Sequence, residues 1–157
     1  MKNIELVTSV EVKTYDELTP QEAQLVELAR RSTRRSYAPY SHFHVGAAIL
    51  LDNGEIVQGS NQENVAFPSG TCAERTACFY AGSTYPDAKF KMIAVAARDV
   101  TEDFVMQPVP PCGACRQSLL QYETLAGHDV PVLLAGRNEV YRLPSVKSLL
   151  PLSFTNF

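Results

Sequence analysis

Met92-Ile93-Ala94-Val95-Ala96 opens the stretch that decides the fold, and it is a continuous apolar run typical of a buried strand. Pro110-Pro111 interrupt the chain before a helix predicted over 112–123, and residues 130–135 are a second run of the same kind. A strand, a helix and a strand in this order predict a right-handed crossover and a parallel strand pair. Because buried parallel strands need cover on both faces, this stretch predicts an α/β fold.

Four further elements are predicted on the N-terminal side of this stretch. Thr19-Pro20-Gln21-Glu22 combines a capping box with proline at the first helical position, so a helix is predicted from there to about residue 35. Apolar residues then alternate over 43–49, which predicts a strand, and Asn53-Gly54 predicts a type I′ hairpin turn into a second strand at 56–57. Residues 72–81 predict another helix.

One more strand is predicted on the C-terminal side. Residues 136–139 are typical of a short hairpin loop, so 140–143 should run antiparallel to the strand over 130–135. Together these elements predict a three-layer α/β/α sandwich with a mixed five-stranded sheet and helices on both faces. We expect one domain over 19–157, preceded by an N-terminal arm, residues 1–18, whose order the pattern does not define.

The composition narrows the class of protein. A length of 157 residues with 45% hydrophobic and 20% charged residues is ordinary for one globular domain. A nucleic-acid binder that neutralises a phosphate backbone usually carries a basic excess, so the net charge of −3 favours a small substrate and no nucleic acid is expected. No apolar stretch approaches the ~18 residues of a membrane span, and the first thirty residues do not resemble a signal peptide. We therefore expect a cytoplasmic protein that acts on a small molecule without contacting a membrane.

Two segments carry three of the four cysteines: Thr71-Cys72-Ala73-Glu74-Arg75-Thr76-Ala77 and Pro111-Cys112-Gly113-Ala114-Cys115-Arg116-Gln117. Both place cysteine in the first turn of a predicted helix, where free N–H groups and the positive end of the helix dipole favour the thiolate. If the two helix ends converge, Cys72, Cys112 and Cys115 can bind one zinc ion and leave its fourth position open. Such an open position is typical of a catalytic site. Cys78 falls on another helix face and is expected in the core.

Glu74 is the predicted catalytic residue of this constellation. It lies two residues after Cys72, within reach of a water molecule held at the open position. A carboxylate beside zinc can take a proton from that water and return it to the substrate, which is the chemistry of hydrolytic attack at an amidine carbon. Because three thiolates make the zinc site negative, donors to the sulfurs are also needed, and Arg75 and Arg116 are the candidates.

The chain resembles the small homotetrameric zinc-dependent cytidine deaminases over nearly all of 19–154. Besides the two cysteine segments, the resemblance rests on residues 40–48 (YSHFHVGAA), 61–64 (NQEN) and 149–154 (LLPLSF). It implies a cytidine deaminase-like fold, one Zn²⁺ per chain, and conversion of cytidine and 2′-deoxycytidine to uridine and 2′-deoxyuridine with release of ammonia, in pyrimidine salvage.

The resemblance also implies how the nucleoside is bound. Phe43 would stack on the pyrimidine, and Asn61 and Glu63 would hydrogen-bond the ribose hydroxyls. The N–H of Ala73 would contact the base carbonyl. The nucleoside is therefore expected to be bound through both its base and its sugar.

A homotetramer with shared active sites is a further implication of the resemblance. Phe67 and Phe154 would reach the active site of a neighbouring subunit. Several relatives carry tyrosine at the position of Phe67, so a hydroxyl contact is missing from this chain there.

Other interpretations of the same residues stay open at this point. A Cys-x-x-Cys pair can be redox-active, and a cluster of four arginines over 30–35 can face solvent, another subunit, an RNA or a phosphate. Asn61 and Glu63 can hydrogen-bond their own backbone as turn residues, and Phe154 and Phe157 can fill a groove of their own chain. The deaminase could also act on another aminopyrimidine, such as a nucleoside antibiotic. A non-catalytic zinc-stabilised interaction module is the third alternative.

Overall fold

A computed structural model gives the fold, and it describes residues 1–155. In this part of the chain six strands form one sheet in the order β1-β6-β5-β4-β2-β3. The strands are β1 (Glu11–Thr14), β2 (His44–Leu51), β3 (Ile56–Ser60), β4 (Phe90–Arg98), β5 (Val132–Ala135) and β6 (Glu139–Leu143). The helices are α1 (Pro20–Ser32), α2 (Ala73–Thr84) and α3 (Gly113–Ala126), with 3₁₀ turns η1 (Tyr15–Glu17), η2 (Thr33–Arg35), η3 (Phe67–Ser69) and η4 (Val146–Leu149).

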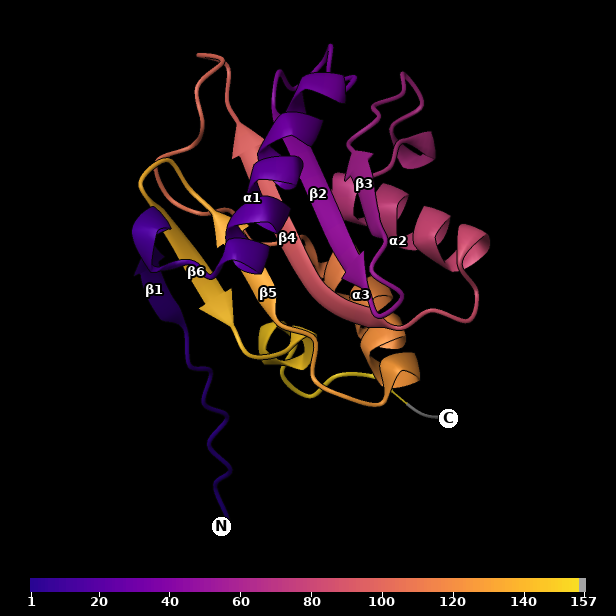
Figure 1. The fold of residues 1–157 in the computed structure, drawn as a ribbon. Coiled ribbons are helices and arrows are strands. Elements are labelled where there is room, and N and C mark those ends of the chain that lie inside the picture. The colour runs from indigo at the N-terminus through magenta and orange to yellow at the C-terminus, as the bar shows by residue number, and fades with distance from the viewer. Residues whose placement is uncertain (156–157) are drawn as a thin grey trace.

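The sheet is mixed and covered on both faces, as predicted. β4 and β5 pair in parallel, and every other strand pair is antiparallel, including β5 with β6. Helix α1 lies on one face, and α2 and α3 lie on the other (Figure 1). The three-layer α/β/α prediction is therefore confirmed. None of the described helices is long and apolar enough to cross a membrane.

The sixth strand is the difference from the predicted five. β1 comes from the N-terminal arm and pairs antiparallel with β6, Val12 opposite Tyr141. It has four residues, three of them exposed, so no buried stripe marks it in the sequence. A short strand at the edge of a sheet is defined by its long-range partner rather than by its own pattern.

The turn between β2 and β3 also differs from its prediction. A type I′ turn needs a positive φ at both central residues, but here only Gly54, at φ 89°, lies in the left-handed region. The N–H of Gly54 donates to Leu51 O, and the N–H of Leu51 donates to Glu55 O. The hairpin is thus closed by a three-residue loop with glycine at its last position, which demands only one left-handed residue.

Two glycines bring helices directly onto the sheet. A Cβ on Gly59 in β3 would lie 2.4 Å from Ala73 O and 2.5 Å from Ala77 N of α2. On the opposite face, a Cβ on Gly46 in β2 would lie 2.2 Å from Ala29 O of α1. Any larger residue at either position would force backbone apart. These contacts fix the height of α1 and α2 above the sheet.

Candidate functional site

The first turns of α2 and α3 meet, and they bring the three predicted metal ligands together. Cys72 and Cys112 are the N-cap residues of the two helices, and Cys115 lies in the first turn of α3. The Sγ atoms of Cys72 and Cys112 are 3.9 Å apart, those of Cys112 and Cys115 are 3.4 Å apart, and all three lie within 4.8 Å of one another. The convergence expected from the sequence is present.

These separations fit zinc and do not fit a disulfide. Four ligands at a Zn–S distance of ~2.3 Å in a tetrahedron place the sulfurs about 3.8 Å apart. A disulfide needs ~2.05 Å, and all four cysteines are free. Cys78 is buried away from this cluster, and burial raises the pKa of its thiol to about 12. A core position for Cys78 agrees with that environment.

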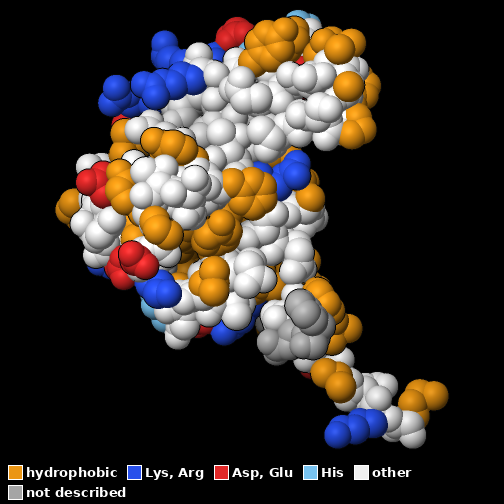
Figure 2. Space-filling view, turned by 90° about the vertical axis from the view of Figure 1, so that its right-hand side faces the viewer, with side chains coloured by type: hydrophobic (Ala, Val, Ile, Leu, Met, Phe, Trp, Pro, Cys, Tyr) orange, Lys and Arg blue, Asp and Glu red, His pale blue; other side chains and the backbone are white. Residues whose placement is uncertain are grey.

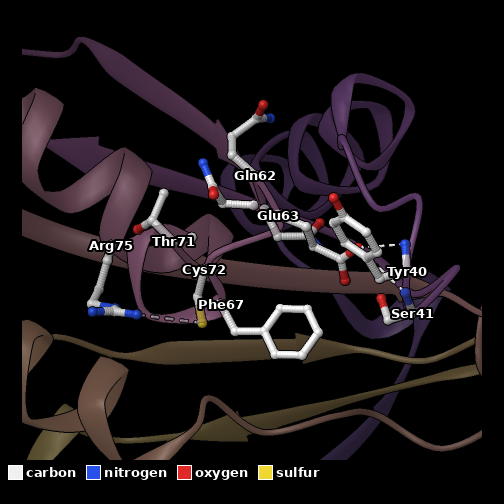
Figure 3. A pocket seen from close by; sticks show the side chains of 11 residues that line it. Tyr40, Ser41, Gln62, Glu63, Phe67, Thr71, Cys72 and Arg75 are labelled. Atoms are coloured by element: carbon white, nitrogen blue, oxygen red, sulfur yellow. Dashed lines mark hydrogen bonds between the residues drawn. The ribbon is translucent and has the colours of Figure 1, made fainter.

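The sulfurs lie in a field that favours a thiolate. The Cys115 thiol hydrogen-bonds Cys72 and lowers its pKa to about 5, against the opposing effect of burial, and Arg75 and Cys112 act in the same direction as Cys115. Arg75 Nη2 lies 3.9 Å from Cys72 Sγ (Figure 3). The same thiolate raises the pKa of Cys115. Arg75 thus stands where the sequence placed it, as a donor to a ligand sulfur.

Glu74 is buried behind the cysteines. Only 4% of the residue is exposed. Burial raises the pKa of its carboxyl, its own N–H opposes this, and the nearby Cys72 thiolate adds to the rise. The nearby Cys115 thiol acts in the opposite direction and lowers the pKa of the carboxyl. A carboxylate kept from water next to a metal-binding cluster is suited to carry a proton rather than to pair with a cation.

A cavity of about 520 Å³ opens beside Cys72. Figure 3 shows side chains from its wall. The cavity is lined by Tyr40, Ser41, Asn61, Gln62, Glu63, Asn64, Phe67, Gly70, Thr71, Cys72 and Arg75. Its volume is in the range of small-molecule sites and suits one nucleoside. The predicted ribose contacts, one predicted aromatic residue and one metal ligand therefore share one wall.

Asn61 and Glu63 also hold the backbone of the cavity wall. Asn61 Oδ1 accepts hydrogen bonds from Ser36 Oγ and from the N–H of Val45, and its Nδ2 donates to Phe43 O. Glu63 Oε2 accepts from the N–H groups of Tyr40 and Ser41. These partners belong to the segment over 36–45 and not to the residues' own turn, so both side chains brace a neighbouring stretch of backbone instead of the turn that the sequence left open. The same contacts fix their side chains at the cavity.

Other predicted residues lie outside the cavity lining. Phe43 is half-buried just before β2, and Ala73 is buried at the start of α2. Arg116 donates to Pro111 O and Leu149 O, and no hydrogen bond to a cysteine sulfur is found for it among the described residues. It therefore anchors the loop before Cys112 to η4. Phe154 is 65% exposed and does not line the cavity.

Tyr40 is the most informative residue that was not predicted. Its ring meets that of Phe67 edge-to-face, with centroids 5.8 Å apart, and both rings are exposed at the cavity. The motif over 40–48 was recognised, but nothing in its spacing assigned Tyr40 a partner that lies 27 residues away. Thr71 and Gly70 line the cavity as well, and their only signal was their position before Cys72.

Comparison with known proteins agrees with this geometry. The sequence profile of the "Cytidine and deoxycytidylate deaminase zinc-binding region" matches residues 19–126. A cytidine deaminase from Halalkalibacterium halodurans is 37% identical over 131 residues, 83% of this chain and 92% of that protein. The crystal structure of cytidine deaminase from Burkholderia pseudomallei has a TM-score of 0.72 at 34% identity, covering 87% of this chain and 100% of that one. A blasticidin-S deaminase from Bacillus cereus is 31% identical over 149 residues, 92% of this chain and 99% of that protein.

Three cysteines at two helix ends, a buried carboxylate and an adjacent cavity define a zinc-dependent hydrolytic deaminase. The chain belongs to the cytidine and deoxycytidylate deaminase family, and within it to the small cytidine deaminases with a three-cysteine site. Its activity is that of a cytidine deaminase, and its zinc-binding region holds the Cys72, Cys112 and Cys115 cluster. The predictions of an enzyme, of zinc and of this fold are confirmed.

Proposed function

We propose that the chain converts cytidine and 2′-deoxycytidine to uridine and 2′-deoxyuridine with release of ammonia, as a step of pyrimidine salvage. The observation that carries the proposal is the position of buried Glu74 beside the sulfur cluster, one member of which, Cys72, lines a cavity of nucleoside size. Water supplies the new carbonyl oxygen, and the amino group leaves with its electron pair as ammonia.

Glu74 moves the protons of this reaction. When bound, zinc lowers the pKa of a water molecule and acts as a Lewis acid. The Glu74 carboxylate takes a proton from water, gives it to the ring nitrogen of the pyrimidine and then serves the departing amine. Because the residue is almost fully buried, its carboxylate exchanges protons with the substrate rather than with bulk water.

The remaining side chains hold the nucleoside and tune the cluster. Phe43 stacks on the base, the Ala73 N–H contacts the base carbonyl, and Asn61 and Glu63 bind the ribose. The clamped conformations of Asn61 and Glu63 support their role, because side chains held before binding lose little entropy on binding.

Two arginines serve the cluster in different ways. Arg75 withdraws charge from Cys72, as its 3.9 Å contact with that sulfur supports. Arg116 acts through the loop before Cys112, because its hydrogen bonds go to Pro111 O and Leu149 O. Both keep the sulfurs in a geometry and a charge state that suit the metal.

The active assembly in this proposal is a homotetramer with shared sites. Phe67 at 74% and Phe154 at 65% are exposed aromatic residues on two different segments near the site and the chain end. Leu152 is exposed beside Phe154, so the apolar tail over 149–154 presents surface that another subunit can cover. Phe157 lies outside the described residues.

A kinetic experiment tests the function. Purified protein incubated with cytidine should change the ultraviolet spectrum to that of uridine and release one ammonia per nucleoside. Glu74→Gln, expressed in parallel, is the matched inactive control. A wild-type protein that contains zinc and leaves cytidine unchanged would overturn the proposal and favour the non-catalytic zinc module.

The assembly is tested separately, by light scattering together with kinetics. Phe154→Ala should lower kcat/KM severalfold although the zinc content stays at one per chain. Gln117→Ala is the comparison, because the Gln117 amide donates to the backbone oxygen of Phe154 and the change leaves the Phe154 ring in place. A monomer with full activity would exclude shared sites.

One alternative substrate has specific support. The blasticidin-S deaminase match extends over 92% of this chain, further than the 83% of the Halalkalibacterium cytidine deaminase. Initial rates with cytidine and with blasticidin S distinguish the two substrates. A raised KM for cytidine in Glu63→Gln with an unchanged KM for blasticidin S would assign Glu63 to the ribose.

We also infer that the protein works in the cytoplasm as one catalytic domain over 19–157. The support for the compartment is that all four thiols are free, as a reducing environment keeps them. Fractionation of cells that express the tagged chain tests it.

A further inference from the structure

A hollow of about 560 Å³ lies beside the C-terminal end of α1, apart from the nucleoside cavity. It is lined by Glu27, Leu28, Arg31, Arg34, Arg35 and Gln58. The C-terminal end of α1 lies at the top of the molecule (Figure 1). Figure 2 shows Lys and Arg side chains gathered at the upper left of its view. None of the residues that line the hollow has a part in the reaction described above.

The three arginines of the hollow carry uncompensated charge. Among the described residues, no carboxylate pairs with Arg31, Arg34 or Arg35 and no side-chain hydrogen bond is formed by them. Their neighbour Arg30 behaves differently, because its guanidinium stacks 3.9 Å from the centroid of the Phe104 ring and 5.0 Å from that of Tyr15. Three free guanidinium groups on a chain of net charge −3 form a local excess of positive charge.

The helix dipole accounts for only part of this excess. A cation in the last turn of a helix gains ~0.3–1 kcal/mol, and Arg31 lies in the last turn of α1. Arg34 and Arg35 follow the helix, in η2. Their guanidinium groups repel that of Arg31 and each other across the hollow, and they gain no stabilisation from the last turn of the helix. An anion between them would remove the repulsion.

Gln58 adds an amide donor to the three arginines that line the hollow. Gln58 Oε1 accepts a hydrogen bond from Ser32 Oγ, which fixes the amide so that its oxygen is used within the protein. No acceptor for Gln58 Nε2 is found among the described residues. Glu27 is the one carboxylate in the lining, and it opposes an anion.

We propose that this hollow binds the polyphosphate group of a small molecule. The planar guanidinium fork matches two phosphate oxygens, and several arginines around one hollow suit a ligand with several phosphates rather than a single charge. The fixed Gln58 amide adds a neutral donor on the sheet side. The hollow is large enough for a triphosphate and lacks the apolar wall that a base alone would need.

The hollow touches the scaffold of the nucleoside cavity through one segment. Arg35 O accepts hydrogen bonds from Ser60 Oγ and Gln62 Nε2, and the next residue, Ser36, donates to Asn61. A polyphosphate at Arg34 and Arg35 therefore binds to the same stretch of backbone that positions Asn61. The two sites are neighbours but use different side chains.

Calorimetric titration of the zinc-loaded protein with sodium tripolyphosphate at fixed ionic strength tests the proposal. The wild type should bind, Arg34→Gln should weaken the affinity about tenfold, and the double change Arg34→Gln with Arg35→Gln should abolish binding. Lys91→Gln is the matched control, because it removes one exposed positive charge from a distant strand and should change the affinity less than twofold. Glu27→Gln should tighten binding.

Two further arms identify the source of the phosphates. Equal affinity for tripolyphosphate and CTP would show that the polyphosphate group alone is recognised, and tighter CTP binding would show a nucleotide ligand. Inorganic phosphate should bind far more weakly than either. No binding by the wild type, or the same loss of affinity in Lys91→Gln as in Arg34→Gln, would overturn the proposal.

Discussion

Glu22 in α1 and Glu74 in α2 are carboxylates buried to almost the same degree on opposite faces of one sheet, 3% and 4% exposed. Glu22 accepts hydrogen bonds from the Thr19 N–H, from Lys13 Nζ and from Arg142 Nε. Burial pushes its pKa up, but these donors outweigh it and hold the pKa below the ordinary 4.5. At Glu74 burial prevails, and the pKa is raised.

The difference separates a structural carboxylate from a chemical one. Glu22 joins β1, α1 and β6 through its donors, and its charge is neutralised where it stands. Glu74 is left beside a sulfur cluster with no cation in a direct ion pair among the described residues. A buried charge without full compensation lowers stability, and proteins keep such groups where function needs them. The carboxylate on the α1 face of the sheet thus serves stability, and the one on the α2 face serves the reaction.

The largest expected effect concerns the cluster that surrounds Glu74. Cys72→Ala, Cys112→Ala and Cys115→Ala should each lose zinc and all measurable turnover, because two thiolates cannot complete the site. Cys78→Ala is the control within the same helix and should retain one zinc per chain. Metal analysis of the four purified variants decides the ligand set. Zinc retained by Cys115→Ala would show that another residue takes its place.

Glu74→Gln should keep zinc and the fold and lose ~10²- to 10⁴-fold in kcat, because an amide of the same shape cannot carry a proton. Its thermal stability should equal or exceed that of the wild type, since a buried carboxylate is replaced by a neutral group. Turnover close to wild type would remove Glu74 from the mechanism. A large drop in stability would contradict the contrast with Glu22.

Glu63→Gln should raise KM for cytidine about tenfold, because a charge-assisted hydrogen bond to the ribose is weakened. The amide oxygen can still accept from the N–H groups of Tyr40 and Ser41, so the wall of the cavity should hold. The rate with free cytosine, which has no ribose, is the comparison. An equal effect on both compounds would place Glu63 with Glu22 among the structural carboxylates.

The smallest effect on the reaction and the clearest effect on stability are expected for Glu22→Gln. The variant should lose about 1–3 kcal/mol in the free energy of unfolding at neutral pH and keep kcat unchanged. Because the folded pKa of Glu22 is lowered, its contribution is complete above 4.5 and is lost as the pH falls through the lower folded value. Denaturant titrations should therefore give different unfolding free energies for the two proteins at pH 7 and converging values at acidic pH. Glu11→Gln, which alters only an exposed 3.5 Å pair with Arg142, should cost less than ~1 kcal/mol.

Much of the fold and the whole zinc cluster were predictable because their signals are local. The capping box at Thr19, the apolar run over 92–96 and the cysteines ahead of two helices each lie within a few residues. Strand β1 is defined by its pairing with β6, and Arg116 reaches Leu149 O, 33 residues away, and local spacing carries no trace of either partner. The partners of Glu22 in β6 belong to the same class.

Gly59 has a consequence for how the site behaves while it works. With no side chain between β3 and the first two turns of α2, backbone rests on backbone, and there is no rotamer whose change would let the helix slide. Cys72 is the N-cap of that helix and Glu74 lies in its first turn, so the metal ligand and the proton carrier are held on a rigid part of the site. The exposed rings of Tyr40 and Phe67 lie in a turn and in η3, so the aromatic wall of the cavity is carried by short segments rather than by a helix packed directly on the sheet.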